Sequence, residues 1–312
     1  MKRSHAKKKK KKGALVLGIL GVLLLIGGAY ALSVYMSFTS TLKEIHSPIE
    51  REVSDMRVDE VKLDKKQPFS VLMLGVDERE GDAGRSDTII VMTVNPNDKS
   101  SKMVSIPRDT YTEIIGKGSM DKINHAYAFG GIEMSMETVE NLLDIPIDYV
   151  VQINMEGFED IVDAVGGVEV NNTLDFSVGE YDYPKGNLTL DGEEALSYVR
   201  MRYEDPNGDF GRQDRQKQVI QGVMREGASV KSLVNYRSIF NALGDNIQTN
   251  MTFDEMMDVQ KNYRDVVGTV DQLYFEKGTG GKMDDGVWYY QMNEAELAEK
   301  QALLKEHLEL KE

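Results

Sequence analysis

The sequence has no cysteine, and its four histidines are scattered at positions 5, 46, 125 and 307. The absence of cysteine excludes disulfides, thiolate catalysis and cysteine-ligated zinc. The spacing of the histidines does not predict a shared metal site. No Gly-x-Ser-x-Gly sequence is present either, which disfavours a serine hydrolase.

Basic residues are scarce beyond position 12. The first twelve residues contain eight of the 37 basic residues and no acid, which leaves 29 basic against 52 acidic residues, a net charge of −23, in the remainder. Such an acidic body disfavours binding to duplex nucleic acid, because that affinity depends on neutralising phosphates. Any anionic substrate must be held by a local arginine cluster, a metal ion or both.

Charged residues are absent from Gly13 to Leu42, and residues 14–32 are almost wholly apolar. This stretch could cross a bilayer as a helix, with the lysine-rich end in the cytoplasm. We therefore predict a cytoplasmic tail (1–12), a transmembrane signal anchor (13–35), a partly helical juxtamembrane spacer (36–67) and an extracellular domain (68–312). A cleaved signal peptide is the alternative, but the apolar stretch exceeds the about 7 to 15 residues usual there. The spacer could also be a solvated connector without another role.

Apolar runs and capping signals predict alternating strands and helices in the domain. The first three strands show no polar alternation, which indicates burial on both faces and hence a sheet covered by helices on both sides. The sequence Gly278 to Lys282 lacks the first glycine of a phosphate-binding loop and predicts a flexible hairpin turn instead. Strands are expected at 71–76, 88–94, 103–106, 147–153, 168–170, 270–275 and 287–290. Helices are expected at 125–144, 156–165, 191–202, 212–226, from 252, and at 293–310, and residues 171–190 are expected to form a long loop or ragged hairpin.

Charged residues flank the first three predicted strands. Asp77 follows the first, Arg85 and Asp87 precede the second, and Arg108 and Asp109 follow the third. Carboxylates and arginines gathered at strand ends suit a divalent cation and a ligand that contains phosphate. The alternative is that these residues lie in solvated turns.

A second charged cluster lies between two predicted helices. Arginine forks match phosphate oxygens bidentately, and the amides at the start of the second helix also favour an anion. The alternative is a surface helix with ion pairs one turn apart. The cluster consists of Arg200, Arg202, Asp209, Arg212, Arg215 and Gln216.

Several motifs occur in a consistent order between about residues 68 and 230. They are LGVD at 74–77, RSDT at 85–88, IPRD at 106–109, KINHAYAFGG at 122–131, DAVGGVEV at 163–170, VRMRY at 199–203 and GDFGRQDRQ at 208–216. In this series the chain resembles the LytR-CpsA-Psr family of signal-anchored enzymes in Gram-positive cell walls, and in particular its teichoic acid transferases from bacilli. The resemblance implies an α/β fold: a three-layer α-β-α domain with a central mixed sheet, preceded by one N-terminal transmembrane helix.

The resemblance also implies a reaction. A phosphotransferase of this family moves an anionic glycopolymer, here expected to be wall teichoic acid, from a polyprenyl-diphosphate carrier to the C6 hydroxyl of N-acetylmuramic acid in peptidoglycan. Polyprenyl phosphate is released. The implied place is the cell membrane, with a single-pass type II topology and the catalytic domain outside. The implied partners are the carrier-linked polymer, peptidoglycan and the membrane, with no nucleic acid.

The family pattern assigns roles to individual residues. Asp77 and Asp87 match its magnesium-binding aspartates, and Mn²⁺ would accept the same oxygen ligands. The matches to pyrophosphate contacts are Arg85, Arg108, Arg200, Arg202 and Gln216, and Lys122, Asp209, Arg212 and Arg215 also lie in family motifs. We list Arg85, Arg108, Arg200, Arg202 and Asp209 as candidate catalytic residues, and Lys122, Arg212, Arg215 and Gln216 as further substrate-binding candidates.

Three questions stay open at this level. Asp209 or Asp109 could act as the base for the acceptor hydroxyl. An apolar slot for the prenyl chain could be lined by Val219, Ile220, Val223, Phe240 and Leu243, although this spacing also fits ordinary core. The same site could serve a pyrophosphatase of polyprenyl-diphosphate lipids, and a non-enzymatic lipid-binding or regulatory module is a further alternative.

Overall fold

A computed structural model of the 312-residue chain describes residues 53–77, 84–202, 205–227, 246–266 and 270–310. The predicted cytoplasmic tail and signal anchor lie outside these ranges, as does most of the predicted spacer. Within the described ranges no helix combines the length and apolar character needed to cross a bilayer.

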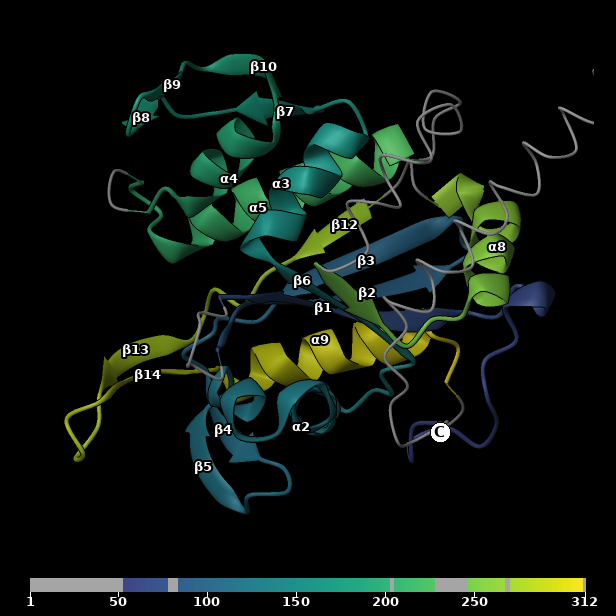
Figure 1. The fold of residues 1–312 in the computed structure, drawn as a ribbon. Coiled ribbons are helices and arrows are strands. Elements are labelled where there is room, and N and C mark those ends of the chain that lie inside the picture. Colours follow the sequence, from purple (N-terminus) through teal and green to yellow (C-terminus); the bar gives the residue numbers. More distant parts are fainter. Residues whose placement is uncertain (1–52, 78–83, 203–204, 228–245, 267–269, 311–312) are drawn as a thin grey trace, which may run out of the picture.

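A six-stranded mixed sheet forms the centre of the molecule (Figure 1). The strand order is β11 (Ile247–Thr249), β6 (Tyr149–Asn154), β1 (Phe69–Val76), β2 (Ser86–Asn95), β3 (Ser100–Ser105) and β12 (Val270–Leu273). Strand β1 pairs antiparallel with β2 and parallel with β6, and β3 pairs antiparallel with β2 and parallel with β12. Edge strand β11 is antiparallel to β6. The predicted mixed sheet is confirmed.

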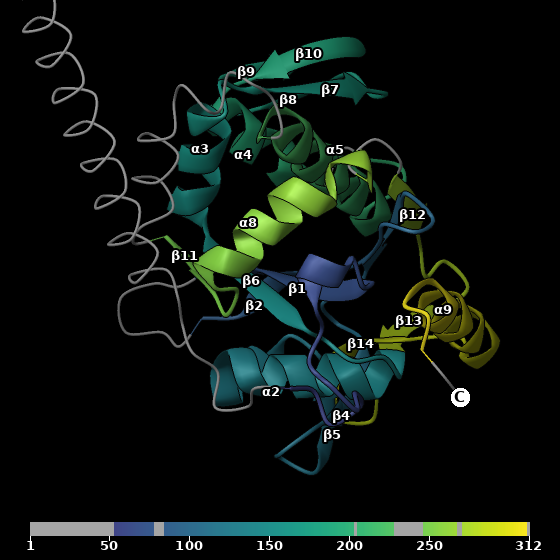
Figure 2. The same cartoon turned by 90° about the vertical axis from the view of Figure 1, so that its right-hand side faces the viewer.

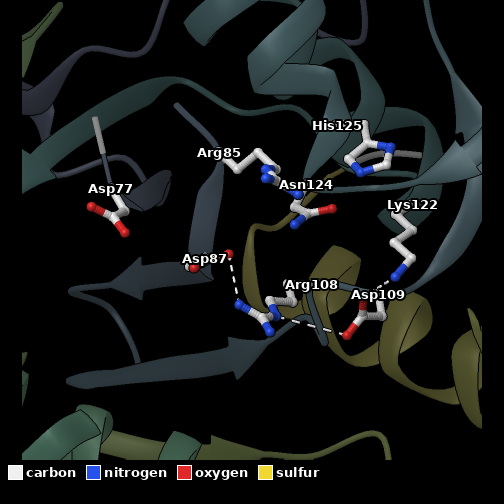
Figure 3. Close-up of a pocket in the computed structure, with 8 residues that line it drawn as sticks. All are labelled: Asp77, Arg85, Asp87, Arg108, Asp109, Lys122, Asn124 and His125. Carbon is white, nitrogen blue, oxygen red and sulfur yellow. Dashed lines mark hydrogen bonds and ion pairs between the residues drawn. The ribbon is translucent and has the colours of Figure 1, made fainter. Parts of the chain in front are cut away.

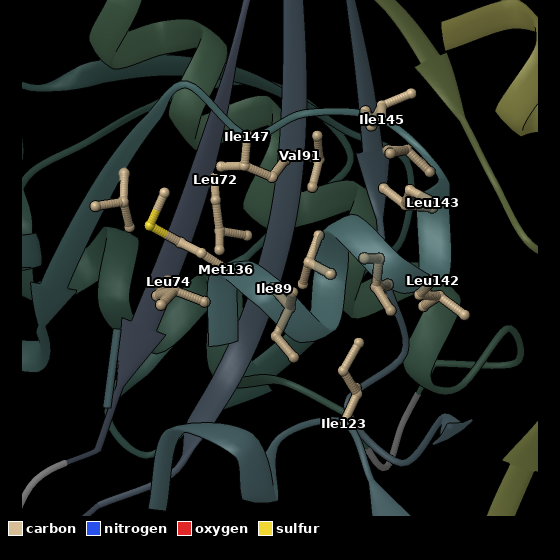
Figure 4. Close-up of a cluster of buried hydrophobic side chains, with 14 of the residues drawn as sticks. Leu72, Leu74, Ile89, Val91, Ile123, Met136, Leu142, Leu143, Ile145 and Ile147 are labelled. Atoms are coloured by element: carbon tan, nitrogen blue, oxygen red, sulfur yellow. The ribbon is translucent and has the colours of Figure 1, made fainter. Parts of the chain in front are cut away.

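Helices cover both faces of this sheet (Figures 1 and 2). Helices α2 (His125–Leu143) and α9 (Glu294–His307) lie on one face, where Leu72, Leu74 and Ile89 of the strands pack with Met136 of α2 (Figure 4). The opposite face packs against α8 (Phe253–Asn262), the short helices η1 (Leu63–Lys65) and η2 (Arg264–Val266), and part of α5 (Asp209–Gly227). The β1, β2 and β3 strands are therefore buried on both faces, as their uninterrupted apolar runs predict.

A second hydrophobic core lies against α5, which contributes Val219 to it. It contains α3 (Met155–Ala164), α4 (Gly192–Arg200), the pair β7 (Val168–Asn172) and β10 (Gly186–Leu190), and the hairpin β8 (Phe176–Val178) and β9 (Tyr181–Tyr183). Residues 171–190 thus form ordered strands, fixed in part by Asn172, whose side-chain amide donates to the Tyr183 carbonyl over 2.9 Å.

The residues considered for a prenyl slot divide between these cores. Val219 is fully buried in the second core and Val223 packs against it, while Ile220 packs against the sheet core. Phe240 and Leu243 lie outside the described residues.

Residues 53–67 pack onto the domain. The Ser54 hydroxyl donates to Glu140 Oε1 over 2.6 Å, Arg57 Nε lies 2.6 Å from Asp148 Oδ1, and Leu63 is 3% exposed. The folded domain therefore begins before Pro68, and the C-terminal part of the predicted spacer belongs to it.

Two hairpins stand beside the main sheet: β4 (Tyr111–Ile114) with β5 (Ser119–Lys122), and β13 (Thr279–Lys282) with β14 (Trp288–Gln291). The prediction of a turn at 278–282 is wrong, because residues 279–282 pair with β14. The turn lies further on, where Met283 N donates to Val287 O over 3.0 Å and Gly286 has a φ of 77°. Helix α5 also begins earlier than expected, at Asp209.

Candidate active site

A polar cleft of about 340 Å³ opens where β1, β2 and β3 meet the loops at their ends (Figure 3). Six of its lining residues belong to the charged positions singled out from the sequence, which the fold brings together from four segments. The full lining is Asp77, Arg85, Asp87, Arg108, Asp109, Lys122, Asn124 and His125.

The pairing of β1 with β2 places the two aspartates. Val76 at the end of β1 lies opposite Ser86 at the start of β2, and Asp77 N donates to Arg85 O over 3.3 Å. Asp77 and Asp87 therefore enter the cleft from neighbouring strands. Thr88 follows Asp87 in β2, and its Oγ1 accepts a hydrogen bond from Gln216 Nε2 of α5 over 2.9 Å. This bond ties α5 to β2.

Arg108 connects the carboxylates of the cleft. Its Nη1 lies 2.8 Å from Asp87 Oδ1 and its Nε lies 3.7 Å from Asp109 Oδ2. Lys122 Nζ lies 2.6 Å from Asp109 Oδ1. Burial lowers the pKa of Arg108, but the charge and hydrogen bond of Asp87, together with Asp109 and Asp209, outweigh burial and raise this pKa overall. Arg108 therefore stays a cation, which suits a site for phosphate.

The second charged cluster meets the first. Arg212 Nη2 lies 2.7 Å from Asp209 Oδ1, and Arg202 Nε lies 4.0 Å from the same oxygen. Burial, together with the positive charges of Arg108 and Arg202, lowers the pKa of Arg212, although Asp209 and Asp87 oppose this effect. Because Arg108 and Arg212 influence each other, the loop after β3 and the start of α5 face one region.

Arg212 also has an unused donor. Its Nε is buried and has no hydrogen-bond partner among the described residues. A buried donor without a partner is costly, so this nitrogen is suited to an anionic ligand.

Two predicted contacts are placed elsewhere. Arg200 is the exposed last residue of α4, and its charge opposes the burial and the carboxylates that raise the pKa of Glu159 on α3. Arg215 is buried: its Nη1 lies 2.5 Å from Asp205 Oδ2, and it donates to the carbonyls of Tyr198 and Met201. Neither side chain lines the cleft, and neither do Arg202, Asp209, Arg212 and Gln216. We interpret Arg215 as a residue that holds the loop before α5 in place.

Asn124 and His125 line the cleft but were not singled out from the sequence. Asn124 N donates to Arg108 O over 3.2 Å, and its side-chain Oδ1 is buried without a hydrogen bond from the described residues. His125 Nδ1 lies 3.0 Å from Asp121 Oδ2. Both residues directly follow Lys122 and Ile123 at the start of a helix. This position in the sequence could have identified them as candidate site residues.

The carboxylates fit a cation that takes most of its ligands from elsewhere. Among the described residues no group of three or more histidine, aspartate or glutamate side chains is arranged to hold a metal. Asp77 and Asp87 nevertheless share the cleft with several basic groups. Mg²⁺ is commonly held by one or two carboxylates together with water and substrate phosphates, so the residues present fit that ion.

The family model described as the LytR_cpsA_psr family matches residues 32–306. The chain belongs to this family. It is 52% identical over 302 residues to the polyisoprenyl-teichoic acid–peptidoglycan teichoic acid transferase TagU of Bacillus cereus, a match that covers 97% of this chain and 99% of that protein.

Solved structures agree with this assignment. The crystal structure of Bacillus subtilis TagU shares 52% identity, covers 79% of this chain and 99% of that one, and superposes with a TM-score of 0.65. A structure of TagT bound to LIIa-WTA shares 34% identity, covers 85% of this chain and 100% of that one, and gives a TM-score of 0.75.

Proposed function

We propose that this protein transfers teichoic acid to peptidoglycan in the cell envelope. The donor is the polymer linked to a polyprenyl diphosphate, and the acceptor is the C6 hydroxyl of N-acetylmuramic acid. The polymer moves with one phosphate, a phosphodiester forms, and polyprenyl phosphate leaves. The observation that supports this proposal is the cleft that joins Arg108 with Asp77 and Asp87, while the charge of Arg108 acts on Arg212 at the start of α5.

The arginines would neutralise the diphosphate. Arg108 in the cleft and Arg212 at the start of α5 have partly buried side chains, with exposed fractions of 26% and 13%. Phosphoryl transfer depends on positioning and on the stabilisation of charge at the bridging and leaving oxygens. Fixed cations in a site of reduced solvent access supply that stabilisation without reorganisation during the reaction.

Asp77 and Asp87 would hold a magnesium ion. When bound, such an ion supplies charge neutralisation on the phosphate oxygens. In the structure Asp87 pairs with Arg108, so this carboxylate also positions the arginine. Manganese would fit the same oxygen ligands.

Both candidate bases are held by cations. Asp109 pairs with Lys122 and Arg108, and Asp209 pairs with Arg212 and accepts a hydrogen bond from Gln213. Because a loose phosphoryl-transfer transition state demands little covalent help from the protein, we assign both aspartates to the positioning of cations.

The anchor completes the proposal. Residues 13–35 would fix the enzyme as a single-pass type II protein at the cell membrane, so that the domain faces the wall and reaches the lipid carrier. This topology follows from the lysine-rich start and the long apolar stretch of the sequence.

The proposal can be tested with the full-length protein in detergent. The assay would combine a synthetic prenyl-diphosphate disaccharide with uncross-linked peptidoglycan oligomers and detect products by mass spectrometry, with and without Mg²⁺. We expect an adduct linked by a phosphodiester that requires Mg²⁺, and a loss of about 10²- to 10³-fold in kcat for Arg108→Ala. Asp87→Asn should also raise the Mg²⁺ concentration needed for half-maximal rate.

A matched control is Arg225→Ala. Arg225 lies in the last turn of α5, is 54% exposed and pairs only with Glu226 among the salt bridges of the described residues, so its removal should leave turnover unchanged. Release of prenyl phosphate at an equal rate without acceptor would favour a pyrophosphatase. Tight lipid binding without any product would favour a binding or regulatory module, and full activity in chelator would remove the metal from the proposal.

A further inference from the structure

The single tryptophan of the chain, Trp288, lies on the β13–β14 hairpin and is 43% exposed. The hairpin extends from the side of the main sheet, next to β4 and β5 (Figure 1). Every residue of β13 is exposed. An exposed indole on a projecting hairpin offers a large apolar area to a binding partner.

The neighbouring strand supports the indole ring from one side. A β-carbon built on Gly280 would overlap Trp288 Cζ2 and would lie 3.0 and 3.1 Å from Cη2 and Cε2. The absence of a side chain at Gly280 thus lets the ring lie across the backbone of β13. A β-carbon on the adjacent Gly281 would meet nothing within 4 Å. The ring therefore has a firm base on one face of β13, and the opposite face is open at Gly281.

The base of the hairpin is joined to the cleft. Tyr290 N donates to Asp109 O over 2.8 Å, and the Tyr290 hydroxyl donates to Phe275 O over 2.6 Å. The Tyr289 ring lies 4.9 Å from the Tyr111 ring and 5.8 Å from Lys122 Nζ. Asp109 and Lys122 both line the cleft, so the base of the hairpin adjoins it.

Other exposed apolar side chains lie on elements that carry cleft residues. Seven large hydrophobic side chains are exposed among the described residues: Met120 lies on β5 with Lys122, Phe129 lies on α2 with His125, and Val287 and Trp288 lie on the hairpin. Phe129 follows the cleft residue His125 on α2 and contacts its ring at 5.9 Å. An exposed apolar rim that adjoins a charged cleft is a feature of a binding surface.

We propose that the Trp288 hairpin docks the glycan backbone of the peptidoglycan acceptor; this inference rests on the proposed function. Amino sugar rings have apolar C–H faces that can stack on an indole while their hydroxyl groups stay hydrated. The tip of the hairpin bears Asp284 and Asp285 beside Lys282. These two carboxylates on the hairpin disfavour the polyphosphate chain of the donor, and they do not hinder a sugar backbone.

A membrane surface fits this hairpin less well than a glycan. The described chain enters the domain at residue 53, and Ser54 binds Glu140 near the C-terminal end of α2. The hairpin lies by β4 and the cleft, where α2 begins. Helix α2, which is kinked at Gly130 and Gly131, lies between the entry point and the hairpin.

The single tryptophan makes a direct test available. Its fluorescence in the full-length protein in detergent would be recorded during titration with three probes: soluble glycan strands free of teichoic acid, the prenyl-diphosphate donor, and phosphatidylglycerol vesicles. We expect the emission to change on addition of the glycan strands, and to stay the same with the donor and with the vesicles. Trp288→Ala should weaken sedimentation with purified peptidoglycan and raise the KM for acceptor by about 3- to 10-fold, the value of one aromatic stacking contact.

Two variants separate stacking from folding. Trp288→Phe should keep part of the affinity, because it retains a ring, and Met257→Ala, an exposed change on α8, should alter nothing. The KM for donor should be unchanged in Trp288→Ala, Trp288→Phe and Met257→Ala. A change of emission with donor or vesicles in place of glycan would overturn the inference, as would an unaltered acceptor KM in Trp288→Ala. Glycan-dependent emission without any transfer would instead contradict the proposed function and leave the docking surface intact.

Discussion

The ion pair of Arg215 with Asp205 is almost wholly removed from water, with exposed side-chain fractions of 6% and 5%. The guanidinium also donates to the carbonyls of Tyr198 and Met201, and it faces the Phe176 ring at 5.4 Å. Asp205 in turn accepts from Asn207 N over 2.8 Å. These contacts fix the loop that leads into α5, and through it the position of Asp209.

We therefore expect Arg215→Met to act on stability. Removal of one partner leaves a buried, unpaired carboxylate, which should lower the free energy of unfolding by about 3 to 5 kcal/mol. Thermal or denaturant unfolding followed by circular dichroism measures this change. The double variant Arg215→Met with Asp205→Asn should recover part of the loss, and Arg225→Met should leave it unchanged.

An Arg215→Met variant with unchanged stability would assign this residue another role. The sequence pattern included Arg215 among the substrate-binding candidates. If Arg215→Met unfolds like the wild type but binds the donor more weakly, the side chain contacts the substrate in a conformation that differs from the one described.

Local signals predicted individual elements well. Asp191 and Thr252 begin α4 and α8 with capping boxes, since a cap depends on residues three positions apart. The β13 strand was missed, because two of its four residues are glycines with low strand propensity. Its pairing depends on β14 and on Tyr290, whose partners are distant in sequence.

The residues of the candidate site were likewise predicted where a local sequence signal places them, and missed where a distant contact does. Charges directly after or before apolar strands, such as Asp77 and Arg108, were predicted because strand ends meet at one edge of a sheet. The burial of Arg215 could not be predicted, since it depends on a partner ten positions away across an irregular loop. The same holds for Asn124, whose place in the cleft is set by its contact with the Arg108 backbone.

Helix α9 contains the buried His307, which joins the C-terminal helix to the sheet. Its Nδ1 lies 2.7 Å from Thr93 Oγ1 and its Nε2 lies 3.0 Å from Ser100 Oγ. Burial and the charge of Lys102 lower the pKa of His307 below its usual 6.5, while Asp98, Asp271 and the Ser100 backbone oppose this change. The folded state therefore favours the neutral ring.

This shift predicts how the docking of α9 depends on pH. The unfolded chain binds a proton to His307 at a higher pH than the folded chain does, so the stabilising effect is complete above 6.5 and is lost as the pH falls below it. We expect the melting temperature of the wild type to fall more steeply between pH 6.5 and 5 than that of His307→Gln. Parallel curves for the two proteins would contradict this role.

At the scale of the whole molecule, a cluster of arginines lies within a strongly acidic chain. Residues 13–312 have a net charge of −23, yet the proposed donor is a polyanion. The long-range field of the protein therefore repels the molecule that its cleft must bind. Salt screens exposed charges over a Debye length of about 10 Å at 0.1 M, and partly buried pairs are screened much less.

This contrast predicts an unusual dependence on salt. Raising NaCl from about 0.05 to 0.2 M at fixed Mg²⁺ should lower the KM for donor by about twofold, because repulsion at a distance weakens more than the contacts at Arg108 and Arg212. Initial rates with donors of increasing polymer length would measure the effect, which should grow with the number of phosphates and be smallest for the disaccharide donor. A KM that rises steeply with salt for every donor would mean that attraction by exposed basic groups controls the encounter, and the cleft would then not be the principal determinant of donor binding.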